Sequence, residues 1–220
     1  MYSFTKKEAL AVIHSCAVAY EENLAHKNLM FVITHGDKAS FFEAGFLPRN
    51  FLHLTGVKTK YSSVDFYNMA VKNKLNEDSI QLTSDGIANK KLSILPALMK
   101  IYLTARMAGD YDYSKSLLVT DKLAGTVTAA MGFRKNGSVY VPNTALNTDL
   151  RDIVHRPVQK IAVMFVKPKQ DEKYTNLTYI AKGVTIDDAI LQAVLKEKTD
   201  LENMTAAFPI PRKSTENNED

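Results

Sequence analysis

The sequence has a single cysteine, few glycines and no long apolar run, and each shortage excludes a class of protein. Cys16 alone cannot form a disulfide framework or a cysteine metal cluster within one chain. The apolar run at residues 161–166 is far shorter than the roughly 18 residues that a membrane-spanning helix needs. The first residues lack the basic-then-apolar order of a secretory signal. We therefore expect a reduced, cytoplasmic protein with no membrane partner.

Phosphate loops and metal-ligand spacings are missing as well. The nine glycines form no glycine-rich phosphate loop, and the chain shows no βαβ alternation, which argues against Rossmann and P-loop enzymes. The five histidines have neither the His-x-x-x-His nor the His-x-His spacing of a zinc site. We expect neither a metal ion nor a cofactor.

The net charge of +4 is unevenly distributed along the chain. The last six residues carry three acids and no base, and the rest of the chain carries +7. Residues 133–169 hold seven bases against two acids, and residues 46–64 hold three bases and no acid. Such local excesses suit a polyanionic partner such as nucleic acid. A solvated basic surface is the alternative that charge alone leaves open.

Helical periodicity dominates the first half of the chain and β-rich segments dominate the second. The predicted helices cover residues 5–25, where Thr5 and Glu8 have capping-box spacing, 62–75, 92–107 and 185–196. The predicted strands cover residues 29–34, 40–46, 51–54, 116–120, 126–133, 138–141, 160–167 and 175–181, with a type I′ turn at Asn136-Gly137. This order predicts an α+β fold in which N-terminal helices precede a mainly antiparallel sheet of four to six strands. We expect residues 1–212 to form one domain and residues 213–220 a disordered acidic tail.

The segment Asn-Phe-Leu-His-Leu-Thr-Gly-Val at residues 50–57 carries the most informative polar groups. Alternation in a strand would place Phe51, His53 and Thr55 on one face. An imidazole transfers protons near neutral pH, and the lysines that follow can hold a phosphate. This pattern indicates a compact polar site at a strand end. A core histidine bonded to a backbone carbonyl is the structural alternative.

The string Phe-Leu-His-Leu-Thr-Gly at residues 51–56 resembles the hallmark of the PBECR4 domains of phages and mobile elements. These domains belong to the barnase–EndoU–colicin E5/D–RelE (BECR) nuclease-like group. Further similar pieces follow in the expected order, at residues 66–67, 131–133, 139–143, 160–167 and 179–183. The resemblance implies helices packed on an antiparallel sheet and a metal-independent ribonuclease, in which the RNA 2′-hydroxyl attacks its own phosphate.

The resemblance also implies roles for particular residues. His53 occupies the motif position and is the expected proton-transfer group, with Thr55 beside it. Lys167 and Lys182 lie at the ends of two late strands and are expected to hold phosphate in the catalytic site. Eight residues are expected to bind nucleic acid: Arg49, Lys58, Lys60, Arg134, Lys135, Tyr140, Asn143 and Lys169. Of these, Tyr140 and Asn143 are expected to position a sugar or base.

Several other residues have both a functional and a structural interpretation. His155, with Arg151 and Arg156, either contacts phosphate or belongs to an exposed basic loop. The three phenylalanines Phe41, Phe42 and Phe46 are expected in the core, as is Cys16.

The chain departs from barnase-type chemistry in one respect, because no acid accompanies His53 in its segment. Two rival hypotheses therefore stay open. The first is a non-catalytic phage or mobile-element protein that binds a host protein, for example to block a nucleic-acid machine in the host cytoplasm. The second is an enzyme acting on a nucleotide or a small phosphate.

Overall fold

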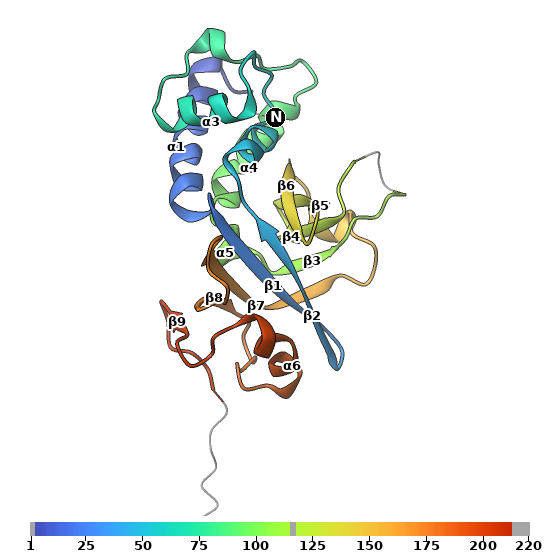
Figure 1. The fold of residues 1–220 in the computed structure, drawn as a ribbon. Helices are drawn as coiled ribbons and strands as arrows, with labels where there is room; N and C mark the ends of the chain where they lie inside the picture. Colours follow the sequence, from blue (N-terminus) through green and yellow to red (C-terminus); the bar gives the residue numbers. More distant parts are fainter. Residues whose placement is uncertain (1–2, 115–117, 213–220) are drawn as a thin grey trace, which may run out of the picture.

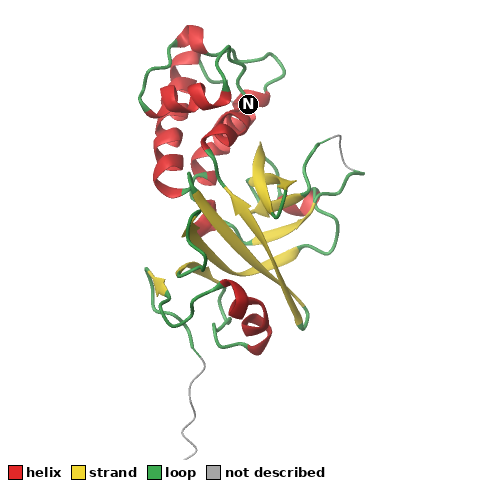
Figure 2. Ribbon diagram, in the orientation of Figure 1, coloured by secondary structure: helices red, strands yellow, loops and turns green. Residues whose placement is uncertain are grey.

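A computed structural model describes residues 3–114 and 118–212 of the 220-residue chain. Its helices are α1 (Lys6–Asn23), α2 (Phe51–Thr55), α3 (Ser63–Val71), α4 (Ile87–Leu98), α5 (Ile101–Thr104) and α6 (Ala189–Lys198). Its strands are β1 (Lys27–His35), β2 (Lys38–Gly45), β3 (Met107–Asp110), β4 (Lys122–Gly125), β5 (Ala130–Asn136), β6 (Val139–Leu146), β7 (Gln159–Pro168), β8 (Asn176–Ile180) and β9 (Thr205–Ala206). Three 3₁₀ turns, η1 (Pro48–Asn50), η2 (Glu77–Ser79) and η3 (Leu150–Asp152), lie in the connections. Figure 2 shows these helices and strands along the chain.

The nine strands of the described residues form one sheet, in the order β1-β2-β6-β5-β4-β3-β7-β8-β9. Strand β1 also pairs with β7, so the sheet curls back on itself (Figure 1). Two pairings, β2–β6 and β8–β9, are parallel, and the others are antiparallel. The α+β class is thus confirmed, but four to six strands was too few. The short strands β3 and β4, Met-Ala-Gly-Asp and Lys-Leu-Ala-Gly, have no β-branched residue and no marked alternation, so the sequence gives no signal for them.

Strand β7 is the centre of this sheet. It pairs with β1 along most of its length, with β3 at residues 159–160 and with β8 at residues 163–166. A strand has two edges, so β3 and β8 share the edge opposite β1. Residues 161–166 are buried, which explains the continuous apolar run in this part of the sequence.

Two apolar layers cover the two faces of β1 and β7. On one face, helices α1 to α4 pack against Leu29 and Phe31 of β1 and Met164 of β7 (Figure 1). On the other face, α6 and the residues after it pack against Met30 and Phe165. Cys16, Phe42 and Phe46 are buried as expected, but Phe41 is 36% exposed, because the alternation of β2 turns it away from Phe42.

The capping box at the start of α1 is confirmed. Thr5 Oγ1 accepts a hydrogen bond from the Glu8 backbone N–H at 3.2 Å, and the Glu8 carboxylate accepts one from the Thr5 N–H at 2.8 Å. Reciprocal bonds of this kind satisfy amide groups that a helix N-terminus otherwise leaves unpaired.

The helix predicted at residues 92–107 is partly wrong. Helix α4 begins earlier, after Gly86 in the left-handed region (φ +70°), and ends at Leu98; residues 107–110 are the strand β3. Pro96 lies inside α4, within its last turn. The strand expected at residues 116–120 lies partly outside the described residues, and residues 118–120 are not in a strand.

The turn between β5 and β6 also differs from the prediction. Asn136 pairs with Val139, so the two central residues are Gly137 and Ser138 rather than Asn136 and Gly137. Only Gly137 has a positive φ, +63°, which is the pattern of a type II′ turn and not of type I′. The hairpin itself is confirmed.

None of the described helices has the length and apolar character needed to cross a membrane. The tail expected at residues 213–220 lies outside the described residues.

Candidate functional site

The motif Phe-Leu-His-Leu-Thr-Gly forms the short helix α2 and its end, not the predicted strand. The 3₁₀ turn η1 leads directly into α2, and Gly56 ends it in the left-handed region at φ +71°. In a helix the side chains of Phe51, Leu54 and Thr55 share the buried face, while His53 is exposed. The common face expected for Phe51, His53 and Thr55 is therefore wrong, because the period is helical.

The hydroxyl of Thr55 is used within its own turn. Thr55 is fully buried, and its Oγ1 donates to the Leu52 carbonyl at 2.8 Å and accepts from the Val57 N–H at 3.3 Å. Both bonds hold the end of α2, so the geometry gives Thr55 a structural role and does not present it to a ligand.

Lys91 of α4 is the charged residue that the fold brings to His53. Its Nζ donates a hydrogen bond to the His53 carbonyl oxygen at 2.8 Å. The side chain is half-buried, and burial lowers the pKa of Lys91 because the charged form loses hydration. The approach depends on Gly56, since a Cβ there would lie 2.8 Å from Lys91 Cδ and 3.2 Å from the Ala88 Cα.

Lys91 also lines an open groove between α4 and β6, which we call the α4–β6 groove. Its volume is about 340 Å³, within the range of small-ligand sites. The lining residues, apolar and polar together, are Ile87, Lys90, Lys91, Leu118, Thr144, Ala145, Leu146, Asn147 and Thr148. A groove with apolar walls, two lysines and several side-chain hydrogen-bonding groups is suited to an anionic ligand with an aromatic or apolar part.

The imidazole of His53 makes no hydrogen bond within the described part of the chain. It is exposed, so both ring nitrogens are open to solvent or to a ligand. The structural alternative, a core histidine bonded to a backbone carbonyl, is therefore wrong for His53.

The two late lysines do not join this groove. Lys167 is 8% exposed, and its Nζ donates to the carbonyls of Asp171 at 2.6 Å and Glu172 at 2.7 Å. The same ammonium lies 4.8 Å from the centroid of the Tyr174 ring. Lys182 is exposed in the turn after β8. Neither lysine lines the α4–β6 groove, and His53 is connected to it only through Lys91, so the structure does not assemble the expected group of His53, Lys167 and Lys182 there.

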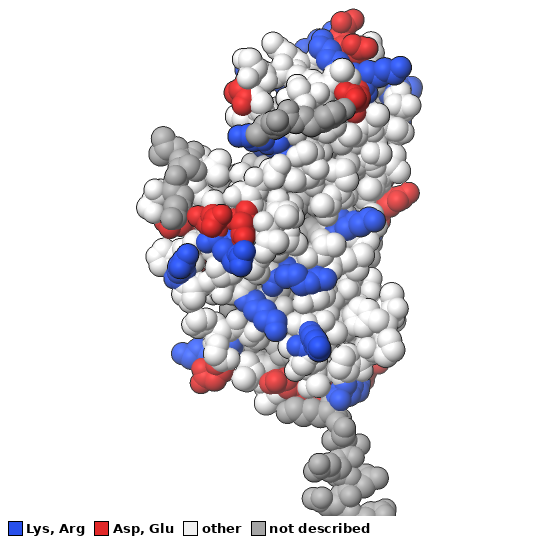
Figure 3. All heavy atoms as spheres, turned by 180° about the vertical axis from the view of Figure 1, so that it is seen from behind, with Lys and Arg blue, Asp and Glu red and all other residues white. Residues whose placement is uncertain are grey.

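The residues expected to bind nucleic acid are dispersed over the surface. Lys58 and Lys60 line a separate hollow of about 320 Å³ with Asp78. Exposed elsewhere are Arg49 on η1, Arg134 and Lys135 next to the β5–β6 turn, and Lys169 after β7. Figure 3 shows Lys and Arg side chains spread over the face opposite to that of Figure 1, with acidic side chains mostly towards its margins.

Tyr140 and Asn143 of β6 make contacts inside the protein. The Tyr140 ring packs edge-on against Phe42, with centroids 5.8 Å apart. The Asn143 amide oxygen accepts a hydrogen bond from the buried Thr120 hydroxyl at 3.2 Å. These contacts support the sheet, and neither residue lines the α4–β6 groove.

Across residues 3–114 and 118–212, no group of three or more His, Cys, Asp or Glu side chains is placed to hold a metal ion.

A family model described as "phage-Barnase-EndoU-ColicinE5/D-RelE like nuclease4", PBECR4, matches residues 12–183. The chain belongs to the PBECR4 family. The resemblance seen in the sequence is thereby confirmed, and the PBECR4 match includes α2, α4 and β6, which form the candidate site. Helix α6 lies outside the match. No curated protein and no solved structure gives a significant match to the chain.

Sequence reasoning missed Lys91, although a signal was present. Lys91 follows Ala88 by three residues and precedes Leu95 by four, so it falls on the apolar stripe of α4. A cation at a core-facing helix position is unusual unless it has a partner. The partner, the His53 carbonyl, is 38 residues away in the sequence and becomes apparent only in the fold.

Proposed function

We propose that this PBECR4 protein is a ribonuclease that cleaves RNA without a metal ion, with His53 as the proton-transfer group. The proposal depends on one observation, the hydrogen bond from the half-buried Lys91, which lines the α4–β6 groove, to the backbone carbonyl of His53, whose own side chain is exposed. The family supplies the reaction class, nuclease-like, and we assign the reaction to the part of the surface where His53 meets this groove.

The chemistry needs a base and nearby positive charge. His53 takes the proton of the ribose 2′-hydroxyl, the 2′-oxygen attacks phosphorus, and the bond to the 5′-oxygen breaks. The leaving 5′-oxygen takes up a proton from solvent or from the imidazolium. Lys91 stabilises the negative charge on the phosphorane oxygens, and its partial burial strengthens that interaction because the local dielectric is low. The products are a 2′,3′-cyclic phosphate and a 5′-hydroxyl.

The lining of the groove suits one nucleotide of an RNA strand. Leu118 and Leu146 offer apolar contact to a base, and Asn147 and Thr148 offer hydrogen bonds. Lys90 is exposed at the rim and adds a second cation. The exposed bases farther away, such as Lys182, contribute a salt-dependent attraction to the polyanion.

Purified protein should cleave single-stranded RNA in the presence of a chelator, and the products should carry cyclic phosphate ends. Replacing His53 by Ala should lower the rate by about 10²–10⁴-fold, the usual contribution of a positioned acid–base group. His14 is a matched control, because its Nδ1 lies 2.8 Å from the Ala70 carbonyl oxygen, whereas the His53 imidazole has no hydrogen bond among the described residues. Replacement of His14 should affect stability rather than the rate. Chelator-resistant cleavage that survives His53→Ala would remove His53 from the mechanism.

A second candidate is the non-catalytic binding protein, and one observation favours it. Among the described residues nothing hydrogen-bonds the His53 imidazole, whereas a catalytic base is usually oriented by a third group. A binder would retain RNA or a host protein with no turnover, and His53→Ala would leave its affinity nearly unchanged. Strand cleavage with defined product ends separates the two candidates.

A further inference from the structure

A further hollow is lined mainly by residues that follow Thr148 of the α4–β6 groove in the chain. Its volume is about 420 Å³, and its lining residues are Asp112, Arg151, Asp152, Val154, His155 and Arg156. An adjoining hollow of about 390 Å³ is lined by Arg151, Arg156, Pro157 and Val158. Arg151 and Arg156 line both, so we treat the two as one feature, the Arg151 hollow.

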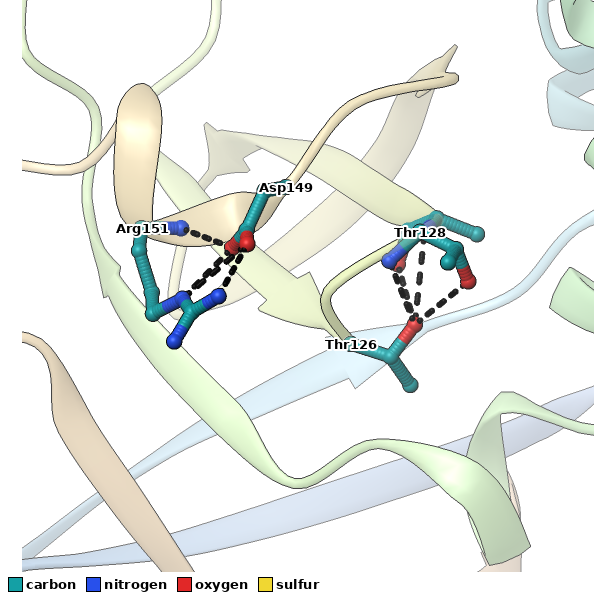
Figure 4. Close-up of polar contacts among 5 residues, drawn as sticks. Thr126, Thr128, Asp149 and Arg151 are labelled. Atoms are coloured by element: carbon teal, nitrogen blue, oxygen red, sulfur yellow. Dashed lines mark hydrogen bonds and ion pairs between the residues drawn. The ribbon is translucent and has the colours of Figure 1, made fainter.

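Arg151 is held in place by a carboxylate. Its Nε donates to both carboxylate oxygens of Asp149 at 3.0 Å, and its Nη2 donates to Oδ2 at 2.5 Å (Figure 4). The same bonds lower the pKa of Asp149 and raise the pKa of Arg151, so both remain charged at neutral pH. Nη1 takes no part in this pair, and the side chain is 58% exposed. One edge of the guanidinium is therefore fixed, and the other is free to donate to a ligand.

The loop that carries Arg151 is anchored on a neighbouring turn. The Leu150 N–H donates to the Thr126 carbonyl at 3.2 Å. Thr126 Oγ1 in turn accepts from the backbone N–H groups of Thr128 at 3.2 Å and Ala129 at 3.3 Å (Figure 4). This anchoring reduces the ordering that a ligand would have to impose on Arg151 when it binds.

Both acidic and basic side chains line the hollow, but the basic groups are the freer of the two to bind a ligand. Asp112 already accepts hydrogen bonds from Ser114, from the hydroxyl at 2.7 Å and from the N–H at 3.0 Å. Asp152 is exposed at the margin. Arg156 is exposed and forms no ion pair within the described residues, and His155 lies next to it in the chain. An anion entering the hollow would meet the free edge of Arg151 and the whole guanidinium of Arg156.

The hollow is close to the candidate site along the chain. Asn147 and Thr148 line the α4–β6 groove, and Arg151 follows three residues after Thr148. Three residues span at most about 11 Å even when fully extended. An RNA strand seated in the groove would therefore reach Arg151 within a few nucleotides.

We propose that the Arg151 hollow binds a backbone phosphate of the same RNA strand whose cleaved bond lies in the α4–β6 groove. The proposal rests on the ribonuclease function proposed above, and it assigns the direction in which the strand leaves the groove. Arg151 and Arg156 act as binding residues and are assigned no part in proton transfer, because neither lines the α4–β6 groove.

The test compares a short strand with a long one. An RNA dinucleotide can occupy the groove alone, whereas an octanucleotide also reaches the hollow. Both are used as 2′-O-methyl analogues, which lack the attacking hydroxyl, so that binding is measured without cleavage. Affinities are measured by fluorescence anisotropy over a series of salt concentrations for the wild type, for Arg151→Gln/Arg156→Gln, and for Lys7→Gln/Lys196→Gln. Lys7 and Lys196 are exposed on α1 and α6, and their replacement gives the same loss of charge elsewhere.

For the octanucleotide, the arginine double variant should bind about tenfold more weakly or worse, and its salt slope should fall by about 0.7, the value for one lost single-strand phosphate contact. For the dinucleotide, the affinity of the arginine variant should equal that of the wild type, because a dinucleotide in the groove does not reach the hollow. Equal losses in the lysine and arginine variants, or no loss in the arginine variant, would overturn the proposal. If the double variant is misfolded by circular dichroism, Arg156→Gln serves alone, because Arg156 has no ion pair among the described residues to lose.

The two proposals fail in different ways. If the wild type cleaves RNA but the arginine variant binds the octanucleotide normally, the phosphate site is wrong and the ribonuclease stands. If nothing is cleaved but octanucleotide binding still depends on the two arginines, the ribonuclease is wrong and the hollow remains a phosphate site of an RNA-binding protein.

Discussion

At the scale of single residues, the candidate site joins the half-buried ammonium of Lys91 to the backbone of His53, whose imidazole is exposed. His53 is exposed because it lies on the outer side of α2, whereas Lys91 is half-buried because it lies on the apolar stripe of α4. The hydrogen bond between them uses the backbone of His53 and leaves its ring free. The fold therefore fixes the backbone of His53 and leaves its imidazole available for the proton transfer that we propose.

Thr55 gives a prediction about stability. Thr55→Val keeps the shape of the buried side chain and removes the bonds to Leu52 and Val57. We expect a loss of about 1–3 kcal/mol in the free energy of unfolding, because a buried N–H and a carbonyl lose a partner. Urea unfolding of Thr55→Val and Thr55→Ser measures it, and Ser, which keeps the hydroxyl, should lose less. A fully stable Val variant would show that the hydroxyl does not hold the end of α2.

Lys91 gives a prediction about pH. Burial lowers its pKa below that of free lysine, about 10.4. Between the lowered pKa and about 10.4, the unfolded chain holds a proton that the folded chain has released, so stability rises with pH in this window. As the pH falls through the lowered pKa, this contribution is lost. Lys91→Met keeps the apolar stem and cannot titrate.

The measurement is the difference in unfolding free energy between wild type and Lys91→Met at several pH values. The free energy of unfolding of the wild type should rise relative to that of Lys91→Met as the pH rises from neutral towards about 10.4. The neighbouring exposed residue provides the control, since Lys90→Met should give a difference that does not change with pH in this way. Parallel curves for both variants would show that Lys91 is not desolvated in solution.

At this scale, the sequence pointed to His53 but did not show which groups contact the candidate residues. His53 stays a prediction as the proton-transfer group, and the structure shows only that it is exposed on α2. Lys167 and Thr55 were chosen for their types, but a sequence does not show that backbone carbonyls already occupy an ammonium or a hydroxyl. Lys91 shows the reverse case. Its residue type did not single it out in the sequence, and only the fold shows that it bonds the His53 carbonyl.

At the scale of elements, the end of α2 depends on Gly56. A left-handed backbone is needed to stop the helix, and a missing side chain is needed to let α4 approach. The two requirements coincide at one residue, which explains why the motif ends in glycine. The strand predicted at residues 51–54 was wrong for a separate reason. A five-residue helix is too short to show the helical period in its sequence, so alternation with a period of two fitted it equally well.

Gly56→Ala should be more destabilising than a glycine replacement with the same backbone. Left-handed backbone costs a non-glycine residue about 1–2 kcal/mol. At Gly36 (φ +59°) a Cβ would meet nothing within 4 Å, so Gly36→Ala reports that cost alone. At Gly56 the new Cβ would also displace Lys91, so a larger loss of stability and weaker RNA binding are expected. Thermal unfolding and anisotropy measure the two effects, and equal losses at both glycines would disprove the tight contact.

The longer elements were predictable because they carry periodic signals. Helices α1, α3 and α6 and strands β1, β2, β7 and β8 lie close to the predicted ranges. The short strands β3 and β4 gave no signal, and the sequence did not mark the start of α4 after Gly86. The closure of the sheet through β1 and β7 is a long-range pairing that no local pattern encodes.

At the scale of the whole molecule, the PBECR4 match and the folded structure end at different places. The match stops at residue 183, and the chain beyond it covers one face of β1 and β7. Ile186, Leu191 and Leu195 are buried there against Met30 and Phe165. The residues outside the match therefore complete an apolar layer of the same sheet.

We predict that a chain truncated after Gly183 does not fold cooperatively. Exposing a buried side chain such as Met30, Val32 or Phe165 costs about 1.5–3 kcal/mol each. The loss from three such residues, about 4.5–9 kcal/mol, is comparable to the lower half of the 5–15 kcal/mol that typically stabilises a domain. Urea unfolding, with a dye that binds exposed apolar surface, should show a broad transition and strong dye binding for residues 1–183.

Two controls connect this result to the apolar layer. A chain ending at residue 212 should unfold like the full chain, because it keeps every described residue that packs on this face. The full-length double variant Leu191→Ser/Leu195→Ser should resemble the truncation, since it removes the two buried α6 contacts and retains the chain length. If residues 1–183 instead unfold in one sharp transition, the matched segment is stable by itself. The residues after 183 would then be a separable cover, and removing them would expose a new surface of β1 and β7 without unfolding the protein.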